Sequence, residues 1–330
     1  MTFIHNQKEK ILSDFIKGQI LPYPHLVKHE NLPLIYNKYH DKNTIPILSG
    51  GGSGHEPAHI GYVGDGMLTA AIYGPLFAPP SSKDIADAIR FLDSGKGVFV
   101  IIKNFEADFK NFSMAINEVR KEGHEVRYII SHDDISIEPK NNYQIRGRGL
   151  AGTVLIHKII GDLARKGAKL EILEESALEL STKIATIGFA TKSAKLPTEE
   201  KSLFQLEENY ISYGIGIHGE EGYRVVPFEN SENLANEIIN KLKLHFHWKK
   251  NDKFILLVNN LGACTDLEMG IFLNDLSQLL EIEDVDIPLI KLGKYMTSLD
   301  MSGISVSLCK ISDKTWLDSL SEPTNAFAWK

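Results

Sequence analysis

The chain has 330 residues, 43% of them hydrophobic and 24% charged, which is enough for two globular domains with separate cores. The formal net charge of −7 argues against a nucleic-acid-binding surface. The longest apolar runs, 98–102 and 254–258, are far too short to span a membrane, and the first residues show no secretory-signal pattern. Cys264 and Cys309 lie far apart and predict neither a disulfide framework nor a zinc site. We therefore expect a cytoplasmic protein that uses no metal or cofactor and binds neither membranes nor nucleic acid directly.

Strand and helix patterns alternate along the first half of the chain. In order, we expect a helix at 11–20, a strand at 45–48, a helix at 83–92 capped by Ser81 or Ser82, a strand at 97–102, a helix at 112–121, a strand at 125–130, and helices at 153–165 and 170–180. Such alternation predicts a mostly parallel sheet.

The second half begins with a strand at 184–190, followed by a polar stretch at 191–209. A strand at 213–218, a helix at 230–242 and a strand at 253–258 come next. The predicted fold class is α/β, with two α/β domains that each have a central sheet flanked by helices. We expect the N-terminal domain at 1–183 and the C-terminal domain at 184–330.

The segment 49–57, Ser-Gly-Gly-Gly-Ser-Gly-His-Glu-Pro, is the strongest local motif. Four glycines in five positions after a strand let the backbone approach a ligand closely. The spacing matches neither GxxxxGK[ST] nor GxGxxG, so a nucleotide is not the first expectation. A ligand-binding loop is favoured over a flexible turn because His55 and Glu56 follow directly.

Two further segments carry groups suited to chemistry. Lys103 and Asp108 follow a predicted strand, at the edge where parallel sheets bind ligands, although a solvated surface loop explains them equally well. His218 stands in Gly214-Ile215-Gly216-Ile217-His218-Gly219-Glu220-Glu221-Gly222, with little bulk around it. A lone histidine is more often structural, and residue chemistry alone leaves nucleophile, ligand and base open for this one.

Together these segments resemble the dihydroxyacetone-binding K subunit of dihydroxyacetone kinases (DhaK). The resemblance rests on 48–57, on Ile-Lys-Asn-aromatic and an Asp at 102–108, on Gly-x-Gly-Ile-His-Gly-Glu at 214–220, and on 153–156, 258–263 and 297–301. It extends from residue 48 to the last residues. The combination of motifs is far more specific than any one of them.

The resemblance implies a covalent hemiaminal between His218 and the ketone carbon of dihydroxyacetone. His218, His55 and Asp108 would take the catalytic roles, and a homodimer is implied as in the family. The residues expected to contact the ketose are Gly52, Ser53, Gly54, His55, Lys103, Asp108 and His218. A bond from a neutral imidazole nitrogen to a carbonyl would select ketones and aldehydes over glycerol.

Departures from the kinase pattern fall on neighbouring loops. Glu106-Ala107 replaces Thr-Gly, 146–149 reads Arg146-Gly-Arg-Gly instead of Gly-Arg-Arg-Gly, Glu221 replaces Pro, and 75–80 also differs. These loops are expected to meet the phosphoryl donor and the partner subunit, where an added carboxylate repels a polyphosphate.

The pattern predicts a non-kinase ligand sensor, similar to the DhaQ co-activators of this family, which act on a TetR-type transcription regulator. The 330 residues also contain no second domain for nucleotide and Mg²⁺, so the chain alone is not expected to be a complete kinase. The alternative is the substrate-binding K subunit of a dihydroxyacetone kinase that works with a separate nucleotide-binding L subunit. An aldolase or isomerase is less favoured, because no further acid–base pair stands out.

Overall fold

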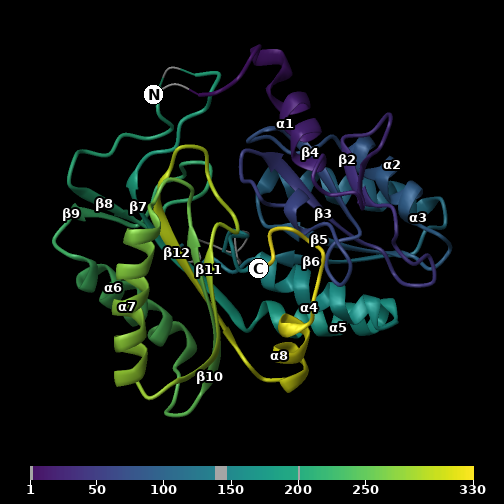
Figure 1. Cartoon of the computed structure of the whole chain (residues 1–330). Helices are drawn as coiled ribbons and strands as arrows, with labels where there is room; N and C mark the ends of the chain where they lie inside the picture. Colours follow the sequence, from purple (N-terminus) through teal and green to yellow (C-terminus); the bar gives the residue numbers. More distant parts are fainter. Residues whose placement is uncertain (1–2, 138–146, 200) are drawn as a thin grey trace.

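The structure, a computed structural model, describes residues 3–137, 147–199 and 201–330. Arg146, singled out above, lies outside them. The described residues form two six-stranded sheets side by side, with the first half of the chain in one and the second half in the other (Figure 1). The predicted fold class, two α/β units with helices flanking each sheet, is confirmed. The predicted boundary between 183 and 184 stays a prediction.

The first sheet has the strand order β1-β2-β4-β3-β5-β6. Its strands are β1 (Leu26–Lys28), β2 (Leu34–Asn37), β3 (Ile47–Ser53), β4 (Ala70–Leu76), β5 (Val98–Lys103) and β6 (Val126–Ser131). The β4-β3-β5-β6 portion is parallel, in line with the predicted mostly parallel sheet, although β4 itself was not predicted; β1 and β2 are antiparallel additions. The carboxyl ends of β3 and β5 therefore lie together, beside the residues that follow them.

Helices cover both faces of this sheet. Side chains of β5 alternate between two cores: Val98 and Val100 pack towards α2 (Ser82–Leu92) and α3 (Glu106–Lys121), and Phe99 packs towards the opposite face. The opposite face is covered by α1 (Ile11–Ile20), α4 (Thr153–Arg165) and α5 (Leu170–Ser181), and the short 3₁₀ turns η1 (Lys8–Lys10) and η2 (Ile60–Tyr62) complete this half. The cap predicted for α2 is confirmed, because the Ser81 side chain accepts a hydrogen bond from the Asp84 N–H.

The second sheet has the strand order β11-β10-β12-β7-β8-β9. Its strands are β7 (Ile184–Lys192), β8 (Tyr210–Tyr213), β9 (Arg224–Pro227), β10 (Lys253–Asn260), β11 (Asp286–Gly293) and β12 (Ser302–Lys310). Only β10 and β11 pair in parallel, so this sheet is mostly antiparallel and the parallel arrangement predicted from the first half of the chain does not extend to it. The helix α7 (Asp266–Ile282) connects that one pair, whereas β12 inserts between β7 and β10 without such a crossover.

One core joins the two halves. The outer face of the second sheet is covered by α6 (Ser231–Phe246) and α7. Its inner face contributes Ile255 and Leu257 to the same cluster that holds Phe99 and Ile101 of the first sheet. Helix α8 (Lys314–Ser321) packs on α4, so the end of the chain returns to the seam between the sheets (Figure 1). In the described residues no helix is long and apolar enough to cross a membrane.

Two predicted element boundaries are wrong at positions that matter for the site. The strand predicted at 45–48 continues to Ser53, because Gly50, Gly51 and Gly52 pair with β4, and a side chain at Gly50 would clash with the Ile72 carbonyl. The strand predicted at 213–218 ends at Tyr213. There Gly214 takes a φ of +74°, which turns the chain out of the sheet and leaves His218 in a loop.

Candidate functional site

The loop 214–222 carries His218 from the end of β8 to the carboxyl end of β3. Two contacts fix its course: the Ser298 hydroxyl donates to the Ile217 carbonyl at 2.6 Å, and the Gly216 N–H donates to the Glu220 carbonyl at 3.0 Å. His218 is thereby presented with 22% of its side chain exposed. A strand could not place the ring in this way, because its neighbours in the sheet would hold the backbone.

His55 stands opposite, directly after β3. Gly54 reaches this position with a φ of +106°, and its N–H donates to both carboxylate oxygens of Glu56, at 2.9 and 3.1 Å. Burial raises the pKa of that Glu56 carboxyl. The His55 ring is fully buried, with Nδ1 2.8 Å from the Thr297 carbonyl oxygen and Nε2 3.0 Å from Nε2 of His218. The site is therefore assembled from both halves of the chain.

The acceptors around the two rings define which nitrogens carry hydrogen. A carbonyl oxygen can only accept, so Nδ1 of His55 donates to Thr297. Burial, with the charge of Lys103 adding to it, holds the pKa of His55 well below its usual value, so its Nε2 is a lone pair. His218 then donates from Nε2 to His55, and from Nδ1 to the Glu220 carboxylate at 3.0 Å. In this arrangement three protons are distributed over four ring nitrogens.

Glu220 is the counter-ion of this series of hydrogen bonds. Its second oxygen accepts the backbone N–H of His218 at 3.0 Å. Burial by itself would raise the pKa of the carboxyl, but the hydrogen bond and charge of His218 outweigh burial, Arg148 adds to them, and the pKa falls to about 2. Glu220 is therefore ionised at any pH at which the protein works.

Two phenylalanine rings enclose the histidine pair. Phe77 stacks on His55 with ring centroids 4.8 Å apart and an angle of 6° between the planes. Phe105 meets His218 edge-on at 4.6 Å. Phe77 adopts a φ of +54°, a region that bulky side chains rarely occupy, so the loop after β4 holds this ring over the site against a conformational cost.

Lys103 and Asp108 lie behind the histidines, at the end of β5 and in the first turn of α3. They are only 1% and 4% exposed. Both reach Gly51: a Cβ there would lie 3.1 Å from Asp108 Oδ1 and 3.3 Å from Lys103 Nζ. Burial lowers the pKa of Lys103 and raises that of Asp108, although their opposite charges partly counteract it. Asp108 Oδ1 is buried and has no hydrogen-bond partner in the described residues, so it can accept from a ligand hydroxyl.

The remaining residues of the predicted set are Gly52, Ser53 and Gly54, at the end of β3. The polar groups of Ser53 and Gly54 already have hydrogen-bond partners. The Ser53 hydroxyl donates to the Gly74 carbonyl at 2.7 Å, and the Gly54 N–H is held by Glu56. Gly52 is part of β3, where a side chain would meet the Ala78 N at 2.7 Å. Direct contacts from these three residues to a ketose stay a prediction.

Several neighbours of the histidines were missed by the sequence analysis. Glu220 stands two residues after His218, and Phe105 two residues after Lys103, so their spacing could have drawn attention. Phe77 and Thr297 come from distant segments, and only the folded chain brings them to His55. Arg148 was considered only as a departure from a pattern, yet its guanidinium lies under the His218 loop.

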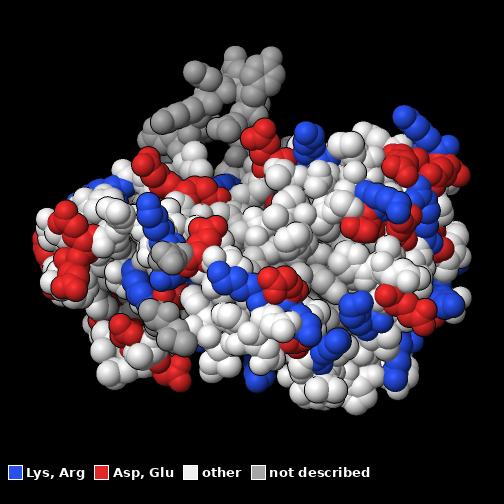
Figure 2. All heavy atoms as spheres, turned by 90° about the horizontal axis from the view of Figure 1, so that it is seen from above, with Lys and Arg blue, Asp and Glu red and all other residues white. Residues whose placement is uncertain are grey.

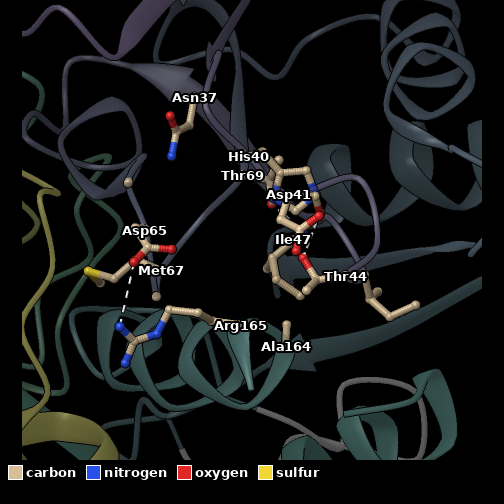
Figure 3. A pocket seen from close by; sticks show the side chains of 14 residues that line it. Asn37, His40, Asp41, Thr44, Ile47, Asp65, Met67, Thr69, Ala164 and Arg165 are labelled. Atoms are coloured by element: carbon tan, nitrogen blue, oxygen red, sulfur yellow. Dashed lines mark hydrogen bonds and ion pairs between the residues drawn. The ribbon is translucent and has the colours of Figure 1, made fainter. Parts of the chain in front are cut away.

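A separate polar cavity of about 130 Å³ lies at the C-terminal end of α4 (Figure 3). Asn37, His40, Asp65 and Arg165 line it, and none of the predicted site residues does. Among residues 3–137, 147–199 and 201–330, no cluster of three His, Cys, Asp or Glu side chains is arranged to hold a metal ion. Acidic and basic side chains are interspersed over the face seen in Figure 2.

Comparison with known proteins gives one consistent family. A family model described as the Dak1 domain matches residues 17–328. The DhaKLM operon coactivator DhaQ of Lactococcus lactis is 52% identical over 327 residues, covering 98% of this chain and 99% of that protein. From the same organism, the dihydroxyacetone-binding subunit DhaK of a PTS-dependent dihydroxyacetone kinase is 40% identical, covering 99% and 98%.

Solved structures agree. A structure described as the dihydroxyacetone kinase operon co-activator Dha-DhaQ superposes with a TM-score of 0.92 at 52% identity, over 96% of this chain and 97% of that one. The dihydroxyacetone kinase of C. freundii superposes with a TM-score of 0.90 at 32% identity, and this chain spans 60% of its length.

Proposed function

The chain belongs to the Dak1 domain family, and from that membership we propose that it captures dihydroxyacetone as a covalent hemiaminal on His218. One observation carries the proposal. Nε2 of His218 lies 3.0 Å from a second imidazole nitrogen whose tautomer is set by a backbone carbonyl, so a nucleophile and its proton acceptor are already in contact. The named relatives, an operon coactivator and a dihydroxyacetone-binding subunit, supply the ligand class.

The bond-forming step balances within the histidine pair. The proton on His218 Nε2 passes to His55 Nε2, which frees the lone pair. That lone pair attacks the ketone carbon, and the carbonyl π electrons move to oxygen. His55 then returns the proton to this oxygen as the hemiaminal hydroxyl. The adduct is an imidazolium that keeps Nδ1–H on Glu220, so the charge beside the carboxylate is the same before and after.

The surrounding groups suit the two hydroxyls of a three-carbon ketose. The buried, unpartnered Oδ1 of Asp108 accepts from one hydroxyl, and Lys103 donates to an oxygen. Phe105, which meets His218 edge-on, limits the length of the ligand. Glycerol has no electrophilic carbon, so it gains no covalent bond for opening the contact between the histidines.

We assign the chain a sensor role, as co-activator of a TetR-type regulator of dihydroxyacetone metabolism. Glu106 stands exposed at the start of α3, and Glu221 is exposed in the His218 loop. These two exposed carboxylates repel a polyphosphate that approaches the site. Glu106 also lies at the N-terminal end of α3, a helix end that would otherwise attract the negative charge of a polyphosphate. The proposal includes a homodimer and a cytoplasmic location, where the two free cysteines stay reduced.

A kinase subunit is the second candidate. The 40% identity to a DhaK subunit over nearly the whole chain favours it. In that case the protein transfers a phosphoryl group to dihydroxyacetone when it is mixed with an L subunit and the matching phosphodonor. A sensor makes no dihydroxyacetone phosphate under the same conditions but binds its regulator in a ligand-dependent way.

The covalent step is tested by NMR with dihydroxyacetone labelled with ¹³C at the carbonyl. We expect the bound label to leave the carbonyl range for that of a carbon bonded to oxygen and nitrogen. His218→Ala should abolish this resonance, whereas His124→Ala, which removes another histidine with a carboxylate partner, should preserve it. An unchanged resonance in the His218 variant, or an adduct that borohydride traps on Lys103 as a reduced imine, would overturn the assignment.

A further inference from the structure

Arg148 joins the His218 loop to the opposite half of the molecule. Its backbone belongs to the segment before α4: the Asp134 N–H donates to the Arg148 carbonyl at 3.0 Å, and the Gly147 carbonyl accepts from Asn104 Nδ2 at 2.8 Å. These contacts tie it to the residues that follow β5 and β6. The residue is only 8% exposed, and its side chain points the other way, towards the second sheet.

The guanidinium makes its contacts where the loop leaves the sheet. Nη2 donates to the Gly214 carbonyl at 2.7 Å, and Nε donates to Asp134 Oδ2 at 2.6 Å. Ser136 completes the junction, because its hydroxyl contacts both Asp134 Oδ1, at 2.6 Å, and the Gly214 carbonyl, at 3.2 Å. The point at which β8 ends is thus held by a buried charged network from the first half of the chain.

The third nitrogen of the guanidinium faces Glu220. Nη1 lies 3.9 Å from Glu220 Oε2 and has no hydrogen-bond partner among the described residues. Gly216 crosses directly over this pair, and a Cβ there would clash with both the carboxylate and Nη1. Arg148 therefore lies beneath the loop and beside the carboxylate that holds Nδ1 of the His218 ring.

We infer that Arg148 is a positioning residue for ketose capture: it holds Glu220 and the root of the 214–222 loop so that His218 Nε2 meets His55. It touches no ligand and acts through Glu220 and Gly214. The inference deepens the proposed function and rests on it for the ligand, but the ordering of the loop can be measured without any ligand.

Arg165 provides a matched control. It is also a partly buried arginine with several carboxylate partners, Asp65, Asp162 and Glu322, but it lies at the opposite end of α4, beside the polar cavity (Figure 3). Replacing either arginine by methionine removes a charge and keeps most of the side-chain volume. Only Arg148→Met should change the position of the His218 ring.

The first measurement is hydrogen–deuterium exchange of the ligand-free protein. Arg148→Met should raise amide exchange in 214–222 relative to the rest of the chain, and Arg165→Met should leave that segment unchanged. Equal exchange in 214–222 for the wild type and Arg148→Met overturns the inference, whether or not the protein binds a ketose.

The second measurement is a double-mutant cycle on dihydroxyacetone affinity by calorimetry. Arg148→Met should weaken binding by about tenfold to a hundredfold, the range for losing a buried charged hydrogen-bond donor. If Arg148 acts through Glu220, the variant with both Arg148→Met and Glu220→Gln should be little weaker than the worse single variant, and Arg148→Lys should recover part of the loss.

The outcomes separate the two proposals. Additive losses in the Arg148/Glu220 cycle, or wild-type affinity in Arg148→Met, sink the positioning role and leave the ketose site intact. Absence of ketose binding by the wild-type protein sinks the proposed function instead, and the exchange measurement then decides the role of Arg148.

Discussion

Replacing Glu220 with glutamine isolates the electrostatic part of ketose capture, because glutamine keeps the size of the side chain and removes its charge. The pKa of Glu220 falls from 4.5 to about 2, mostly through His218. A fall of this size corresponds to roughly 3 kcal/mol. Since 37% of the side chain is exposed, solvent screening reduces the coupling to about 1–2 kcal/mol. Because His218 carries the same charge before and after capture, only the part of this coupling that orients the ring bears on affinity, and we expect Glu220→Gln to weaken dihydroxyacetone binding by roughly threefold to tenfold.

The pH dependence follows from the same shift. Because the folded pKa is depressed, the contribution of Glu220 is complete above the ordinary value of 4.5 and is lost only as the pH falls through about 2. Calorimetric titration of the wild type at neutral and mildly acidic pH should therefore show no loss of affinity from this carboxyl. Wild-type affinity in Glu220→Gln would refute the counter-ion role.

Glu221→Gln supplies the control for the same experiment. It removes one negative charge from the neighbouring, exposed position of the same loop. We expect ketose affinity to change by less than about twofold, because an exposed charge at this distance is screened. Equal losses in the two variants would show that the effect is one of net charge and does not come from the hydrogen bond to His218.

Three other substitutions test residues that contact the site or hold the fold around it. His55→Ala should weaken ketose binding by about 1–3 kcal/mol in calorimetry, because the donor to the new hydroxyl is lost. Gly216→Ala should lower ketose affinity in calorimetry, because its Cβ would clash with the Glu220 carboxylate and with Nη1 of Arg148. Asn259→Leu should lower the free energy of unfolding in urea by about 1–3 kcal/mol, since its buried amide bonds the Met296 backbone in both directions, as donor at 2.7 Å and acceptor at 3.0 Å.

Local patterns predicted the elements that depend on local chemistry. The helix at 11–20 and the helix at 153–165 match α1 and α4 residue for residue, because their apolar stripes face one shared core. The parallel part of the first sheet also followed from alternation of strands and helices. The strands β1, β2, β4, β9, β11 and β12 were not predicted, since their register depends on partners elsewhere in the sequence.

The residues of the candidate site also fall into those that the sequence predicts and those that it does not. His55, Lys103, Asp108 and His218 could be singled out because each follows a strand or lies among glycines. The turn that carries His218 could not, because the pattern around Ile215 and Ile217 alternates as in a strand. Both side chains are buried, but in different clusters: Ile217 lies in the core that joins the two sheets, where the Ser298 hydroxyl holds its carbonyl, and Ile215 packs with Leu261 and Met301. Contacts with segments distant in the sequence therefore decide between strand and turn there.

In the ligand-free protein, the hydrogen bond between His55 and His218 competes with ligand binding. Any ligand must first separate two nitrogens that already bond to each other at 3.0 Å, so occupancy depends on two independent quantities, the strength of that internal bond and the strength of the new one. The strength of the internal bond depends on the Phe77 ring, which stacks on His55, and on the Thr297 carbonyl, which accepts from His55 Nδ1. A ligand need not touch either group. Substitutions in this second layer can therefore move the ketose concentration at which the protein fills, while the reacting atoms and the chemistry of recognition stay the same.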